Sequence, residues 1–96
     1  MEGPGQASGK RVPRLEKSLA ILLRSLSGSR VVLELKNDCE ISGVVDECDE
    51  GMNTVLVDVT IVTPKGSVRS LKTSFVSGAS IRYVHIPPEV KMMSNL

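Results

Sequence analysis

The amino-acid sequence predicts a small, mainly β domain: a short N-terminal helix followed by a five-stranded, bent antiparallel sheet that forms a small open barrel. Three observations lead to this prediction. Leucines recur at helical spacing before Gly28, hydrophobic and polar residues alternate after it, and turn residues separate five such segments at intervals of about 7–12 residues. The 96 residues leave room for one domain.

The helix is predicted to begin near Pro13 and to end at Gly28, which suits the left-handed conformation that closes many helices. So short a helix is stable only when it lies on an apolar surface. Residues 1–12, rich in glycine and small polar residues, are predicted to form a disordered tail. The apolar face of the helix consists of Leu15, Leu19, Leu22, Leu23 and Leu26.

Five strands are predicted, over residues 31–36, 39–49, 54–61, 67–76 and 80–86. Gly43 lies inside the second strand, where a glycine usually marks a bend or a close approach of backbones. The spacing of Val68, Leu71 and Phe75 breaks the period of two and predicts a bulge in the fourth strand. The third strand is expected to place on one face Val55, Val57, Val59 and Ile61.

Pro87 and Pro88 cannot continue a strand ladder, so the domain is predicted to span residues 13–88, with residues 89–96 as a C-terminal tail. A chain this short is marginally stable alone. Cys39 and Cys48 are too few for a disulfide framework and are expected to be reduced thiols, and the single histidine, His85, lacks partners for a metal site. We therefore expect oligomerisation to stabilise the chain, with no cofactor, no metal and no membrane segment.

Charge is distributed unevenly along the chain although the net charge is only +1. Residues 10–30 contain six basic residues and one acidic residue, and residues 31–60 contain eight acidic residues and one lysine. Two interpretations stay open at this point: a surface with two poles, one of which could face phosphates, or separate charges that are each solvated.

Two segments resemble known motifs. The first combines the hydrophobic strand from Val31 to Asp38, the bending Gly43 and the loop Asp49-Glu-Gly-Met-Asn53, and it is similar to the first Sm motif. The second runs from Phe75 through Ser77-Gly78 to Ile-Arg-Tyr-Val-His-Ile-Pro87 and is similar to the second Sm motif. Both occur in order, so the chain resembles the Sm and Sm-like protein family, and within it the D-type branch.

The resemblance implies an Sm fold and a non-enzymatic subunit of a heteromeric ring, expected to have seven Sm or Sm-like members, that binds uridine-rich single-stranded small nuclear RNA. Details of the helix and of the second motif favour a nuclear ribonucleoprotein that processes histone pre-mRNA 3′ ends, with assembly in the cytoplasm left open. Two alternatives remain: a D-type core subunit of the splicing ribonucleoproteins, and a ring scaffold with little direct RNA contact.

The resemblance also implies a set of RNA-binding residues. Asn53 would hydrogen-bond a base edge, Asp49 would hold the loop, and Gly78 would allow close approach to the base. Gly51 and Ser77 depart from the family, which usually has a stacking side chain and an arginine there, so the base pocket should be weak. Without the resemblance, Asp49 and Asn53 are ordinary turn formers. The predicted set is Asp49, Gly51, Met52, Asn53, Ser77 and Gly78.

Catalysis and metal binding are not predicted. The carboxylates at positions 46, 47, 49 and 50 are crowded into one loop region without an accompanying histidine or lysine, which is typical of solvated charges. No phosphate-binding glycine loop or nucleophile motif is present in the sequence. An unrelated oligonucleotide-binding barrel would need aromatic residues on its sheet, and Phe75 and Tyr83 are the only two aromatics.

Overall fold

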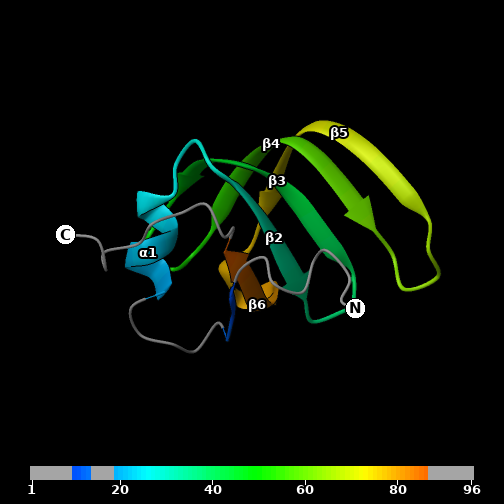
Figure 1. Cartoon of the computed structure of the whole chain (residues 1–96), viewed down its shortest axis with the longest axis horizontal. Coiled ribbons are helices and arrows are strands. Elements are labelled where there is room, and N and C mark those ends of the chain that lie inside the picture. The colour runs from blue at the N-terminus through cyan, green and yellow to red at the C-terminus, as the bar shows by residue number, and fades with distance from the viewer. Residues whose placement is uncertain (1–9, 14–18, 87–96) are drawn as a thin grey trace.

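The computed structural model describes residues 10–13 and 19–86, and within them a bent antiparallel sheet carries a single α-helix at one end (Figure 1). The strand order is β1-β6-β2-β3-β4-β5, with β5 outermost at the end far from the helix. The predicted mainly β fold with one short helix is therefore confirmed. The elements are β1 (Lys10–Pro13), α1 (Leu19–Ser25), β2 (Arg30–Leu35), β3 (Glu40–Cys48), β4 (Thr54–Val62), β5 (Val68–Val76), the 3₁₀ turn η1 (Gly78–Ser80) and β6 (Ile81–Ile86).

Helix α1 packs its leucine face on the sheet. Leu19, Leu23 and Leu26 are buried, while Ile21 on the opposite side is 69% exposed. The helix ends at Ser25 rather than at the predicted Gly28. Gly28 does have the predicted left-handed conformation, with φ +91°, and its N–H donates to the Val45 carbonyl, which ties the turn after the helix to β3. The predicted first turn, including Leu15, lies outside the described residues, as do the predicted tails over residues 1–9 and 89–96 and the stop at residues 87–88.

Strand β1 corrects two predictions, because residues 10–12 belong to the sheet rather than to a tail and Pro13 ends a strand rather than beginning a helix. The sheet consequently has six strands instead of five. Lys10 to Pro13 pair with Ile86 to Tyr83 in antiparallel register. Four residues contain no readable alternation, so only the edge of β6 explains why this segment is extended.

Two irregularities bend β3 against β4. Pairing shifts between Ser42 and Val44 and again between Val45 and Glu47, and Asp58 has a positive φ of 55°. Asp58 thus adds a residue to β4, and Leu56 and Val59 both point into the core instead of alternating. The predicted face of the third strand was wrong for this reason. The predicted bulge in the fourth strand was also wrong, because β5 pairs with β4 in unbroken register.

Gly43 lies at this bend, as predicted. A Cβ there would stand 3.0 Å from the Val57 carbonyl oxygen and 3.1 Å from the Leu56 Cβ. Any side chain would therefore push β3 away from the bulged part of β4.

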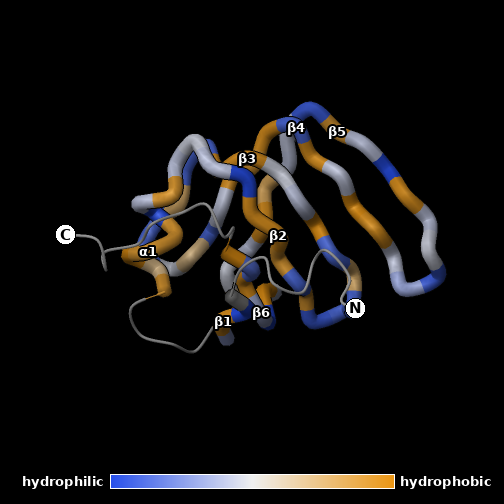
Figure 2. The backbone as a smooth tube through the Cα atoms, viewed as in Figure 1, coloured by the Kyte–Doolittle hydropathy of each residue, from blue (hydrophilic) through white to orange (hydrophobic). Residues whose placement is uncertain are grey.

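The core fills the space between α1 and the concave face of the sheet. Figure 2 shows hydrophobic residues along the helix and alternating along the central strands. Strand β5 contributes the buried Val76 and the partly buried Leu71 to the core, and most of its other residues are exposed, so the outer part of the β4–β5 hairpin projects beyond the core. The buried hydrophobic residues are Leu19, Leu23, Leu26, Val31, Leu33, Ile41, Val45, Met52, Leu56, Val59, Val76, Ile81, Val84 and Ile86.

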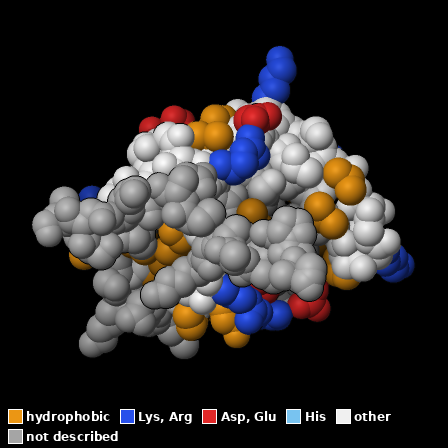
Figure 3. All heavy atoms as spheres, in the orientation of Figure 1, with side chains coloured by type: hydrophobic (Ala, Val, Ile, Leu, Met, Phe, Trp, Pro, Cys, Tyr) orange, Lys and Arg blue, Asp and Glu red, His pale blue; other side chains and the backbone are white. Residues whose placement is uncertain are grey.

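Charges that are segregated along the sequence meet in the fold. Arg11 pairs with Glu34 and Arg30 pairs with Asp58, so basic residues of the first segment neutralise acidic residues of the second. Figure 3 shows basic and acidic side chains interspersed on the visible face of the described residues. The arrangement favours separate, locally paired charges over two poles.

Glu34 joins β1, β2 and β6. Its carboxylate accepts from Arg11 Nε at 2.8 Å and Nη2 at 3.1 Å, and it contacts His85 Nε2. The guanidinium of Arg11 also lies 3.5 Å from the centre of the Tyr83 ring. Hydrogen bonds from Arg11 and then His85 lower the pKa of Glu34 from 4.5 to about 2, against the opposing effect of burial.

Glu34→Gln should destabilise the chain in a pH-dependent way. Because the pKa of Glu34 is lower in the folded chain, its ionised form stabilises the fold above pH 4.5, and this contribution is lost as the pH falls towards 2. Urea unfolding between pH 2 and 7 should show the difference from wild type shrinking on acidification. Glu40→Gln, at an exposed position of β3, is the control, and an equal pH dependence in both variants would contradict the assignment.

Candidate functional site

Two loops meet beside the ends of β3 to β6. The first, residues 49–53, joins β3 to β4, and the second, residues 77–80, joins β5 to β6 and contains η1. Asp49 Oδ1 accepts from the backbone N–H groups of Gly51 and Asn53, both at 2.9 Å. These contacts are the ones expected of a residue that holds the first loop.

Asn53 connects the two loops. Its Nδ2 donates to Asp49 Oδ2 at 3.0 Å, and its Oδ1 accepts from the backbone N–H of Gly78 at 2.8 Å. An amide side chain offers two donor hydrogens and two acceptor lone pairs. One of each is therefore committed within the protein, and one of each remains to face a ligand from this half-buried side chain.

Gly78 is required by contact between the loops themselves. A Cβ on it would lie 1.8 Å from the Gly51 carbonyl oxygen and 2.9 Å from the Met52 carbonyl carbon. The resemblance implied that Gly78 allows close approach to a base, which stays a prediction; the neighbour in the structure is the backbone of the first loop. Gly51 differs, because its own Cβ would come no nearer than 3.4 Å to Asn53 Nδ2.

Met52 does not reach the surface of the site. It is only 5% exposed and belongs to the hydrophobic core, so its side chain anchors the first loop, and a part of Met52 in RNA binding stays a prediction. Its φ of 65° turns the chain between the exposed Gly51 and the half-buried Asn53. The buried Thr54 hydroxyl donates to the Met52 carbonyl at 2.8 Å and fixes this turn.

Ser77 is exposed, and its hydroxyl makes no capping hydrogen bond at the start of η1. The carbonyl of Ser77 instead accepts from the backbone N–H and the hydroxyl of Ser80, at 3.0 and 2.7 Å. The turn thus uses the backbone carbonyl of Ser77 and not its side chain. The two departures from the family pattern, Gly51 and Ser77, both lie at the exposed surface of the joined loops.

Phe75 belongs to the site although it was not among the predicted residues. Its side chain is 67% exposed and lines a hollow of about 390 Å³. Its position two residues before Ser77 and its rarity as an aromatic were the available signals. The hollow can accept an aromatic ring against Phe75, with amide and carboxylate groups at its edge. Its lining comprises Glu47, Cys48, Asp49, Asn53, Val55 and Phe75.

The electrostatics of the hollow favour a neutral group over a phosphate. Hydrogen bonds from the side chain and backbone of Asn53 lower the pKa of Asp49, so its carboxylate is ionised at neutral pH. Burial raises the pKa of the Cys48 thiol, which keeps it protonated. A nucleobase, which is flat and uncharged, suits this combination better than an anion does.

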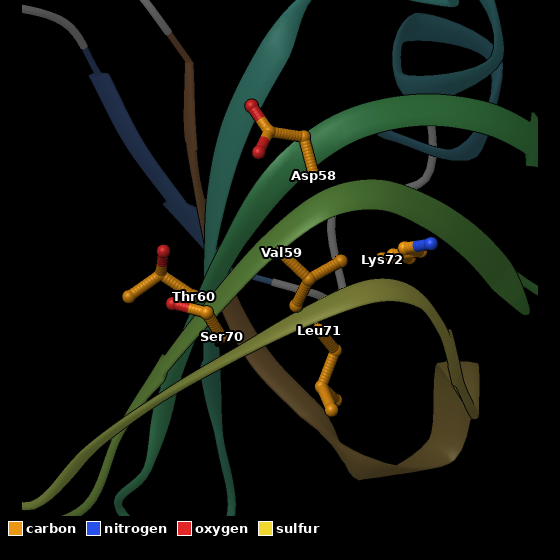
Figure 4. A pocket seen from close by; sticks show the side chains of 6 residues that line it. All are labelled: Asp58, Val59, Thr60, Ser70, Leu71 and Lys72. Carbon is orange, nitrogen blue, oxygen red and sulfur yellow. The ribbon is translucent and has the colours of Figure 1, made fainter.

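A second hollow, of about 470 Å³, lies in the β4–β5 hairpin (Figure 4). Thr60 and Ser70 lie side by side on the paired strands, while the Asp58 carboxylate is directed away from them and is paired with Arg30. The side chains that line this second hollow are a mixture of aliphatic, hydroxyl and charged groups, and their polar atoms do not point toward one common position. The first hollow, next to the joined loops, is the better candidate.

A metal centre has no candidate among residues 10–13 and 19–86, where no three His, Cys, Asp or Glu side chains are grouped to hold an ion. The helix in the described part of the chain is too short to cross a membrane.

Comparison with protein families matches residues 21–86 to the LSM domain, a span that includes both loops. The chain belongs to the LSM domain family. A probable U6 snRNA-associated Sm-like protein LSm2 from Dictyostelium discoideum is 35% identical over 68 residues, 69% of this chain and 58% of that protein. The small nuclear ribonucleoprotein SmD3b of Arabidopsis thaliana is 34% identical over 80 residues, 80% of this chain and 61% of that protein.

The fold of this chain is similar to that of solved Sm proteins. The crystal structure of a heptameric archaeal Sm protein has a TM-score of 0.62 and 25% identity, covering 70% of this chain and 98% of that one. The chain spans about three-fifths of the length of the two eukaryotic relatives. The LSM match begins inside α1, so β1 lies outside the matched residues.

Gly78→Ala should lower the free energy of unfolding by about 1–3 kcal/mol, because its Cβ would overlap the Gly51 backbone. Gly51→Ala is the matched control, since it adds the same methyl group to the facing loop without a contact below 3.4 Å. Urea unfolding of both variants measures the difference. Equal effects on stability would refute the close packing of the two loops.

Proposed function

We propose that this chain is an RNA-binding and scaffolding subunit of a heteromeric Sm-type ring in a small nuclear ribonucleoprotein. The observation that carries the proposal is the pair of loops joined through Asp49, Asn53 and Gly78 within an LSM domain. The names of the relatives, one associated with U6 snRNA and one a small nuclear ribonucleoprotein, support it. A binding role requires no catalytic group, and we propose none.

The shape of the sheet supports ring assembly. Strand β5 is an edge strand, and it carries two exposed hydrophobic residues, Val68 at 62% and Phe75 at 67%. Exposed strand edges invite pairing with another chain. The archaeal relative is heptameric, and we propose a ring of seven Sm or Sm-like subunits here as well.

The chemistry of the first hollow supports single-stranded, uridine-rich RNA as the ligand. The remaining donor and acceptor of Asn53 match the alternating acceptor and donor groups of a uracil edge. Phe75 offers a surface for stacking, which in part replaces the side chains missing at positions 51 and 77. Small residues at those two positions leave this pocket weaker than a complete Sm pocket.

Ser77→Arg should tighten binding of a uridine-rich oligonucleotide to the assembled ring by about fivefold, or about 1 kcal/mol, by supplying a cation that stacks on a base. The hydroxyl of Ser77 makes no capping contact, so the change should leave folding intact. Ser77→Gln is the control for length without charge. Fluorescence anisotropy at constant salt measures the affinities.

An unchanged affinity in Ser77→Arg would contradict direct base contact at this pocket. It would favour the second candidate, a ring subunit that acts mainly as a scaffold. Gly51 and Ser77 are the observations behind that candidate, because neither residue can grip a base.

The finer proposal concerns which particle the ring serves. Residues 18–26, Ser77 in the second loop and the ending Tyr83-Val-His-Ile-Pro87 resemble the tenth Sm-like protein, which replaces the first D-type subunit in the particle that processes histone pre-mRNA 3′ ends. We propose that this chain takes that place, in the nucleus. A D-type core subunit of the splicing ribonucleoproteins is the alternative, and the SmD3b relative favours it.

Purification of the tagged chain from cells should enrich the small nuclear RNA of the histone-processing particle, because that particle would be its only ring. The bound RNAs are sequenced, and a tagged spliceosomal D-type subunit from the same cells serves as the control. Recovery of the main spliceosomal RNAs without enrichment of the histone-processing RNA would contradict this placement and favour the alternative.

A further inference from the structure

The two edges of the sheet differ in whether a short strand covers them. At one end, the outer edge of β5 has no partner strand among the described residues. At the other end, β1 covers the outer edge of β6. A ring built head to tail needs two different, complementary edges on every subunit. One of the two edges that this sheet could offer is therefore occupied by the chain itself.

Strand β1 precedes the part of the chain that matches the LSM domain, which begins at residue 21. The heptameric archaeal Sm protein is covered over 98% of its length by a match to only 70% of this chain. A sheet limited to residues 21–86 would end at β6, with the edge of β6 open. The covering segment thus belongs to residues that precede this match.

We propose that β1 is a displaceable cover on β6, and that the exposed β5-type edge strand of a neighbouring Sm-type subunit replaces it during assembly. This inference rests on the proposed ring. It adds that the outer edge of Ile81–Ile86 becomes available to a neighbouring strand only when β1 leaves.

The cover is shorter than the edge it occupies. Strand β1 has four residues and pairs with positions 83–86, whereas β6 has six and begins at Ile81. Ile81 and Arg82 thus have no partner in β1 and offer a place where an incoming strand can begin to pair. Strand β5 has nine residues, enough to pair along all of β6. The longer ladder favours the neighbour over β1.

The side-chain contacts that hold β1 are few. Val12 is partly buried against the core, and Arg11, whose side chain is 52% exposed, contacts the Glu34 carboxylate and the Tyr83 ring. Water competes with Glu34 for the exposed guanidinium, so this ion pair is weaker than a fully buried one. These contacts align β1 on β6, and a longer partner strand can replace them.

A disulfide lock tests whether β1 must leave. Arg11 and His85 face each other across the two strands, and antiparallel partners have Cα atoms about 4.5–5.5 Å apart, within the range of a disulfide. The variant Arg11→Cys/His85→Cys is made in full-length chain in which Cys39→Ala and Cys48→Ala remove the native thiols. The oxidised form holds β1 in place, and the reduced form of the same protein is its control.

The probe is a fluorescent, capped peptide with the sequence of residues 67–77, which contains all of β5. We expect the reduced form to bind it at least about tenfold more tightly than the oxidised form. Equal binding by both forms would overturn displacement while leaving the ring proposal intact. Failure of both forms to bind would overturn the inference, whereas the heteromeric ring itself is tested separately by purification of the tagged chain.

Hydrogen exchange of the wild-type chain gives a second measurement that does not depend on the cysteine variant. Adding the peptide should slow amide exchange at Ile81 and Arg82 and speed it at Arg11 and Val12. Protection of β1 that persists while the peptide is bound would overturn the proposal.

Discussion

The hydrogen bonds of the Asn53 side chain join two loops that lie 25 residues apart at Asn53 and Gly78. The Gly78 N–H donates to Asn53 and the Asp49 carboxylate orients the amide, so both sides of one side chain are fixed. Because Met52 is buried, the first loop is also anchored from beneath. The position of η1, and hence the start of β6, depends on this junction.

Elements whose cause is local could be predicted from the sequence. The predicted strands match β2 to β6 to within one residue at each end, and the leucine spacing located the helix, because each periodic pattern records which side of an element is buried. Gly43 was predicted as a bend or close approach, and the structure supplies the neighbour, the backbone of Val57. Gly78 was predicted to approach a base, and its neighbour in the structure is the backbone of Gly51. These neighbours are distant in the sequence, so a single sequence does not show which residues lie against the two glycines.

Features with a tertiary cause could not be predicted in this way. The four residues of β1 are extended because β6 offers an edge and Glu34 offers an acceptor to Arg11. The extra residue at Asp58 depends on how β3 bends, and it reverses the faces of half of β4. The motif placed Met52 in a loop, but loop membership does not tell which side chain turns inward.

The small residues at positions 51 and 77 fit a subunit that acts within a ring rather than alone. A pocket that relies on one amide and one aromatic face gives weak affinity for a single base. In the ring that we propose, an RNA already held by one subunit reaches the next at a high effective concentration, so several weak pockets together bind the RNA tightly. The same logic applies to the sheet. Among the residues of β5 only Val76 is fully buried, and the exposed Val68 would be covered when a neighbour pairs with this edge. In the proposed ring, fold stability and ligand affinity depend on the same assembly.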